Sequence, residues 1–214
     1  MLNLLQNDLI FCLLCNKILL DNIERNLKMK IDLTKEKKEL SEKPLSRQEI
    51  FTGQIVHLVK DTVILPNEKK ATREVILHNG AVCVVPITDN NEIIMERQFR
   101  YPFNDVIWEI PAGKLDKGET DPLLAAKREL LEETGYTAER FIFIGEYYPS
   151  PAILSEKIYM YVATGLTLGE RSLDEDEFLN VIKVPIDEVI EMIKKNEIPD
   201  GKTQTAVMKA MLLK

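Results

Sequence analysis

Cysteine, histidine and surplus basic charge are scarce in this chain of 214 residues. Its three cysteines, Cys12, Cys15 and Cys83, are too few for a disulfide framework and indicate a reducing, cytoplasmic compartment. The 28 Lys and Arg against 35 Asp and Glu give a net charge of −7, which argues against a general nucleic-acid-binding protein but not against a small anionic substrate. No apolar run approaches the about 20 residues that a membrane-spanning helix needs.

The first 45 residues are interpreted as an N-terminal extension followed by a charged linker. Residues 9–15 are apolar but short, and acidic Asp8 precedes them where a signal peptide would be positively charged. The spacing of Cys12 and Cys15 lacks the second pair that a metal site would need. The segment is expected to be an amphipathic helix lying on the domain, or else the result of a mis-assigned start, with Met29 as the alternative first residue.

The remaining chain, with 45% hydrophobic and 29% charged residues overall, is typical of one globular domain with a small extra sheet. Residues 46–79 are expected to form a β hairpin with strands at 50–65 and 71–78. Residues 80–214 are expected to form the main domain, with strands at 81–87, 92–99, 108–113, 141–147, 158–163 and 178–184 and final helices at 186–195 and 203–213. Mixed strands with helices between and after them predict an α/β (α+β) sandwich.

A loop and a short helix at residues 113–136 carry the strongest local signals. Asp121 is a good N-cap, Pro122 suits the first helical turn and Gly135 suits the C-terminal stop. A helix turns by about 100° per residue, so Glu129, Glu132 and Glu133 fall on one face. Such like charges repel each other and a bound divalent cation would remove that penalty, although a solvated acidic face is the simpler alternative.

The whole window resembles the Nudix box, Gly-x5-Glu-x7-Arg-Glu-U-x-Glu-Glu-x-Gly-U, in which U is apolar. The defined positions are taken by Gly113, Glu119, Arg128, Glu129, Leu130, Glu132, Glu133, Gly135 and Tyr136. There is one departure, because eight residues rather than seven separate Glu119 from Arg128. The extra residue is expected around Thr120 and Asp121, before the helix, so it bears on the placement of Glu119 and leaves the helix in register.

The resemblance implies the Nudix α/β/α fold over residues 80–214 and a divalent metal, Mg²⁺ with Mn²⁺ as an alternative. The implied metal ligands are the main-chain oxygen of Ala112 and the side chains of Glu119, Glu129, Glu132 and Glu133, with Glu132 binding directly or through water. The early hairpin resembles the extra sheet through which ADP-ribose pyrophosphatases of this family pair, which implies a homodimer.

A base for the attacking water is expected on the acidic loop at residues 165–177, because ADP-ribose pyrophosphatases carry their base on a late acidic loop. Glu175 is the first candidate and Glu177 the second. Among the box residues, Arg128 is expected to orient a glutamate through a salt bridge. Glu132 is expected to be catalytic, in addition to its role as a metal ligand.

Further residues resemble the substrate-binding positions of the same subgroup. Pro151 stands about fifteen residues after the box, where this subgroup has its marker proline, and Ala152 departs from the glycine that often follows it. By the same resemblance, Glu156 holds the terminal ribose, Arg100 the diphosphate and Arg73 the adenosine, and Phe51 stacks on adenine.

The function implied is Mg²⁺-dependent hydrolysis of the diphosphate bond of ADP-ribose, or a related ADP-sugar, to AMP and ribose 5-phosphate. The alternatives are another nucleoside diphosphate derivative (a GDP-sugar, NADH or FAD) or a catalytically weak nucleotide-binding Nudix domain. The acidic charge disfavours a role in RNA processing. Both histidines, His57 and His78, fall on expected strands and are interpreted as structural.

Overall fold

The computed structural model describes residues 33–173 and 178–213. Its contacts divide the chain into two units, of which the smaller comprises the residues up to 46 together with 62–72 and the larger comprises 47–61 and 73–214. Cys12, Cys15, Glu175 and Glu177 lie outside the described residues. Within the described ranges, no helix is long and apolar enough to cross a bilayer.

The early part of the chain forms a helix and a three-stranded sheet. Helix α2 covers Leu33–Leu40, and the sheet has the order β1 (Lys43–Thr52), β2 (His57–Ile64), β3 (Lys70–Leu77). The expected single strand at 50–65 is therefore two strands, since a turn in which Gly53 N donates to Val56 O at 2.8 Å interrupts it. Part of the expected linker is helical because its Lys and Glu are good helix formers.

The larger unit is built on two further sheets. One has the order β7 (Ala112–Lys114), β4 (Ala81–Pro86), β9 (Ile158–Leu168), β8 (Tyr136–Tyr147), with β4 and β9 parallel and the other pairs antiparallel. The other has the antiparallel order β10 (Leu179–Pro185), β5 (Glu92–Arg100), β6 (Asp105–Glu109), and a short 3-10 turn at Tyr101–Phe103 joins its last two strands.

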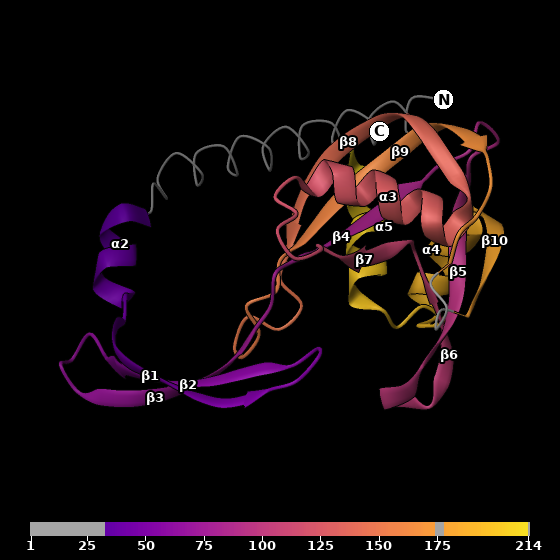
Figure 1. Ribbon diagram of the computed structural model, residues 1–214. Coiled ribbons are helices and arrows are strands. Elements are labelled where there is room, and N and C mark those ends of the chain that lie inside the picture. The colour runs from indigo at the N-terminus through magenta and orange to yellow at the C-terminus, as the bar shows by residue number, and fades with distance from the viewer. Residues whose placement is uncertain (1–32, 174–177, 214) are drawn as a thin grey trace, which may run out of the picture. The chain divides into compact units, whose positions relative to one another are not determined.

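Helices cover both faces of the four-stranded sheet, which confirms the predicted sandwich (Figure 1). Side chains of a strand alternate between faces, and β4 shows this with fully buried residues on both sides. Val82 and Val84 pack in one core with α3 (Pro122–Thr134), whereas Cys83 and Val85 pack in the other with α4 (Ile186–Lys194) and α5 (Gly201–Leu212). Strand β4 thus lies between the two hydrophobic cores and contributes side chains to both.

The expected strand at 108–113 is wrong in one respect, because it is two strands in different sheets. Glu109 ends β6 opposite Glu96, while Ala112 begins β7 opposite Cys83. Between them the chain crosses from one sheet to the other, and the oxygen of Pro111 accepts a hydrogen bond of 2.9 Å from the Val84 amide. This crossing brings Glu109, at the end of one sheet, close along the chain to Ala112, at the start of another.

Candidate active site

A cavity of about 850 Å³ opens in the larger unit, where α3, β7, the end of β5 and the first turn of α5 meet. Its charged lining consists of five basic residues and six acidic ones, namely Arg100, Lys114, Lys117, Arg128, Lys202, Asp116, Glu129, Glu132, Glu133, Glu156 and Asp200. The polar lining and the mixed charge suit a polar, anionic ligand better than an apolar one.

Helix α3 begins and ends where the sequence predicts. The side chain of Asp121 accepts from Leu123 N at 2.9 Å, Pro122 follows in the first turn, and Gly135 adopts a φ of 77° at the C-terminal end. The helix thus begins at Pro122, just after Thr120 and Asp121, around which the extra residue is expected. The register of the three glutamates along α3 is unaffected by it.

Two of these glutamates are buried beside β7. Glu129 and Glu133 expose only 7% and 4% of their surface. The backbone amide of Ala112 donates to Oε2 of Glu133 at 2.8 Å. Gly113 makes room for Glu129, because a Cβ at that position would lie 2.0 Å from its carboxylate carbon. Local packing of β7 against α3 thus fixes where both carboxylates lie.

Arg128 contacts three of the four glutamates of the box. It lies 2.9 Å from Oε1 of Glu129, donates to Glu132 at 2.9 Å and donates to Glu119 at 3.2 Å. Burial alone would lower the pKa of Arg128, but the nearby carboxylates outweigh it and raise that pKa above its ordinary value. Glu119 also accepts from Asp116 N at 3.0 Å, so the longer loop still brings Glu119 to Arg128, outside the cavity lining.

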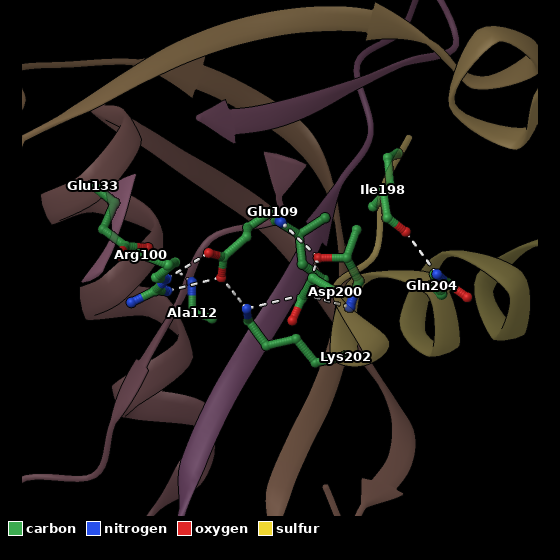
Figure 2. A network of polar contacts seen from close by, with 10 residues as sticks. Arg100, Glu109, Ala112, Glu133, Ile198, Asp200, Lys202 and Gln204 are labelled. Carbon is green, nitrogen blue, oxygen red and sulfur yellow. Dashed lines mark hydrogen bonds and ion pairs between the residues drawn. The ribbon is translucent and has the colours of Figure 1, made fainter. Parts of the chain in front are cut away.

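A second charged group consists of the lining residues Arg100, Lys202 and Asp200 together with Glu109 (Figure 2). Glu109, with 4% of its side chain exposed, accepts from Arg100 Nε at 2.5 Å and Arg100 Nη2 at 2.8 Å, and it also accepts from Lys202 Nζ. Lys202 donates in addition to Asp200 at 3.0 Å. Burial opposes the charge of both Glu109 and Lys202, but their partners outweigh it, so the pKa of Glu109 falls and that of Lys202 rises.

His78 and Glu156 form a third part of the lining. The amide of Gly80 donates to Nδ1 of His78 at 3.0 Å, which leaves Nε2, 3.6 Å from Oε1 of Glu156, to carry the hydrogen of the neutral ring. The amide of His78 donates to Ser155 Oγ at 2.9 Å. The expected position of His78 on a strand is wrong, because β3 ends at Leu77 and His78 lines the cavity instead.

The structure brings together part of the predicted site. Arg100, Ala112, Arg128, Glu129, Glu132, Glu133 and Glu156 line the cavity. Pro151, Phe51 and Arg73 do not belong to that lining, and all three are exposed. The candidate bases Glu175 and Glu177 lie outside the described residues.

The sequence reasoning missed Glu109, Asp200, Lys202 and the role of His78 in the lining. One local signal was available for the α5 end, since Asp200 precedes Gly201 and Lys202 as a recognisable N-cap, and its side chain accepts from Thr203 N at 2.9 Å. Nothing local indicates that Lys202 meets Glu109, because 93 residues separate them.

The lining offers hard oxygen donors for a divalent metal. Among the described residues, no three acidic, thiol or imidazole side chains are grouped closely enough to hold a metal ion. The donor chemistry nevertheless fits, because carboxylate and carbonyl oxygens suit Mg²⁺ and Mn²⁺. The Glu129 carboxylate also lies against Gly113, in a space that a Cβ at that position would fill. Glu129, Glu132, Glu133 and the Ala112 oxygen are the residues that would hold such an ion.

Several known proteins are similar to this chain. One is an ADP-ribose pyrophosphatase of Bacillus subtilis (strain 168), 43% identical over 172 residues, which cover 79% of this chain and 92% of that protein. Another is a methanol dehydrogenase activator of Bacillus methanolicus, 46% identical over 168 residues, 78% of this chain and 90% of that protein.

A crystal structure of an ADP compounds hydrolase shares the fold, with a TM-score of 0.73 and 22% identity over 81% of this chain and 94% of that one. The NUDIX domain model matches residues 77–205, which contain β4, the glutamates of α3, and both Glu109 and Lys202. From this match, and from the identity to full-length relatives, the chain belongs to the Nudix family.

Proposed function

We propose that this protein hydrolyses the diphosphate bond of ADP-ribose, or a related ADP-sugar, to AMP and ribose 5-phosphate, with Mg²⁺ as cofactor and Mn²⁺ as a substitute. The observation that carries the proposal is a single cavity in which the buried carboxylates of α3 face the paired cations Arg100 and Lys202. Hydrolysis of a diphosphate needs both features. The cations neutralise the charge of the phosphates, and the carboxylates are suited to hold the metal ion that activates water.

The chain's own residues divide the work of the reaction. Arg100 lines the cavity, and two hydrogen bonds to Glu109 hold one edge of its guanidinium, so its remaining N–H groups can orient the diphosphate. Arg128 keeps Glu129 and Glu132 in place through contacts of 2.9 Å. Glu156, directed by His78, accepts hydrogen bonds from the terminal ribose.

A divalent ion held at this site would supply positive charge to the phosphate oxygens and would lower the pKa of water. Glu129, Glu133 and the Ala112 oxygen are its proposed ligands, with Glu132 direct or through water. Glu175 is the proposed base that takes the proton from water, and Glu177 is the second candidate.

A homodimer in a cytoplasmic setting completes the proposal. Aromatic side chains are exposed on the β5–β6 hairpin and the segment that joins its strands, with 49% of Phe99, 87% of Tyr101 and 74% of Phe103 accessible in the single chain. An exposed apolar patch of this kind is typical of a protein interface. Light scattering after size exclusion should give twice the 24.6 kDa chain mass, and a monomer would contradict this part of the proposal.

The test is a substrate panel with purified protein. ADP-ribose, ADP-glucose, GDP-mannose, NADH and FAD are each incubated with Mg²⁺, with Mn²⁺ or with EDTA, and products are separated by chromatography. We expect AMP and ribose 5-phosphate from ADP-ribose with the highest kcat/KM, and no turnover in EDTA. Preference for a guanine or flavin substrate would refute the ADP-ribose assignment, and binding of ADP-ribose without turnover would refute the enzymatic one.

A further inference from the structure

Lys202 is buried against the cavity and points at two carboxylates (Figure 2). Only 12% of its side chain is exposed, and its Nζ donates to both Glu109 and Asp200. An ammonium group has three N–H donors, so these two acceptors leave one donor for another group. Because Lys202 lines the cavity, that donor is available to a bound ligand.

Glu109 joins Lys202 to Arg100. A single oxygen, Oε2 of Glu109, accepts from Arg100 Nη2 at 2.8 Å and also from Lys202 Nζ. Two donors on one oxygen lie within about 6 Å of each other, so the two cations are close neighbours on the cavity wall. Glu109 itself is not part of the lining, which places it behind the two cations.

The contact between α5 and the end of β6 does not depend on Lys202. The amide of Ile110 donates to Thr203 Oγ1 at 3.0 Å, and that hydroxyl donates to Asp200 at 2.6 Å. Ala206 and Val207 of α5 are fully buried in the core. Arg100 already supplies a counter-charge to the buried Glu109 through two hydrogen bonds, so neither the helix contact nor the neutralisation of Glu109 requires a second cation at position 202.

We infer that Lys202 binds a phosphate of the substrate beside Arg100, and that Glu109 is the positioning residue that holds both cations toward it. This inference rests on the proposed diphosphate substrate and adds a second protein cation to its recognition. The two cations come from different elements, β5 and α5, and one carboxylate fixes the distance between them. The diphosphate then completes the hydrogen bonding of both.

The experiment compares K202M with K202R, and with K194M as the matched control. Lys194 is 63% exposed on α4, where it pairs with Glu191, and does not line the cavity. For each variant we would measure kcat and KM for ADP-ribose with Mg²⁺, the inhibition constants of ADP and of adenosine, and the thermal midpoint. Adenosine lacks the phosphates, so it separates lost phosphate binding from general damage to the cavity.

We expect K202M to raise KM and the inhibition constant of ADP about 10- to 100-fold, the effect of losing a charge-assisted hydrogen bond. The adenosine constant should stay within about twofold, K202R should recover most of the loss, and K194M should match wild type. E109Q should raise the same two constants, and adding K202M to E109Q should have a smaller effect than K202M alone, since the pair acts as a unit.

Unchanged KM in K202M, or equal weakening of ADP and adenosine, would overturn the inference. Should K202M unfold below the assay temperature, K202Q, which can still donate to Glu109, takes its place under the same two criteria. Wild-type protein that fails to hydrolyse ADP-ribose would instead refute the proposed function. The two failures are therefore distinguishable.

Discussion

Gly113→Ala tests the placement of Glu129 with the smallest possible change. An ideal Cβ on Gly113 would lie 2.0 Å from both Cδ and Oε1 of Glu129 and 2.3 Å from Oε2. Non-bonded carbon atoms prefer about 3.5 Å, so the carboxylate would have to move by about 1.5 Å. A displacement of about 1 Å at a reacting centre can cost about 100-fold in rate. We therefore expect kcat/KM for ADP-ribose to fall by about 100-fold or more.

The fold should tolerate this substitution. The displaced atoms are the end of a flexible side chain, and the charged contact that Glu129, 10% exposed, would lose with Arg128, 29% exposed, is worth about 1.5 kcal/mol. Replacing glycine by alanine returns about 0.4–1 kcal/mol by restricting the unfolded chain. The thermal midpoint should therefore change by less than about 4 °C.

Gly169→Ala is the matched control, because its Cβ would meet only the Gly135 oxygen at an ordinary 3.5 Å. The assay is steady-state release of AMP from ADP-ribose with Mg²⁺, run alongside thermal unfolding of each variant. The reasoning would be refuted by Gly113→Ala protein that is folded and turns over at the wild-type rate. Equal losses in both glycine variants would also count against it.

Three further predictions concern single titratable residues. Glu133→Gln should reduce turnover by at least about 1,000-fold with little change in the thermal midpoint, since its amide oxygen can still accept from Ala112 N; substantial residual activity would contradict the metal assignment. Burial raises the pKa of Cys83 to about 12, so at pH 8 iodoacetamide should modify it only after unfolding, as peptide mass spectrometry would show, and rapid labelling of folded protein would contradict this. The pKa of Glu109 is lower in the folded protein than in the unfolded chain, so ionisation of Glu109 stabilises the fold. This stabilisation is complete above the unfolded pKa of about 4.3 and is lost as the pH falls through the folded pKa. Urea unfolding should accordingly show Glu109→Gln less stable than wild type by about 3 kcal/mol at pH 7. The difference in unfolding free energy should narrow below about pH 4, and a constant difference would mean that Glu109 does not titrate as described.

Local signals in the sequence predict local structure well in this chain. Asp121, Pro122 and Gly135 are the cap, first-turn and stop residues of α3, and all three act where the sequence places them. Because helix capping depends on neighbours within a few positions, the helix and its acidic face could be predicted without the rest of the fold.

Partners distant along the chain could not be predicted in this way. The crossing between Glu109 and Ala112 depends on strand pairing, because Glu109 pairs with Glu96 in the neighbouring strand of its hairpin whereas Ala112 pairs with Cys83 of another sheet. The role of Lys202 depends on a partner 93 residues away. His78 resembles a strand residue in sequence, and only the loop that carries Glu156 shows that it faces the cavity.

The two charged parts of the cavity lining balance their charges in opposite ways. On α3, Glu129 and Glu132 share Arg128, and nearby carboxylates raise the pKa of that arginine. Around Glu109, one buried carboxylate holds two cations. The positive charge of Arg128 therefore offsets the repulsion between neighbouring carboxylates on this helix. The surplus of carboxylate on α3 is then complementary to a metal cation, and the spare N–H groups of the cations on Glu109 are complementary to a phosphate. A ligand that combines both, a metal-bound diphosphate, matches this cavity better than either component alone.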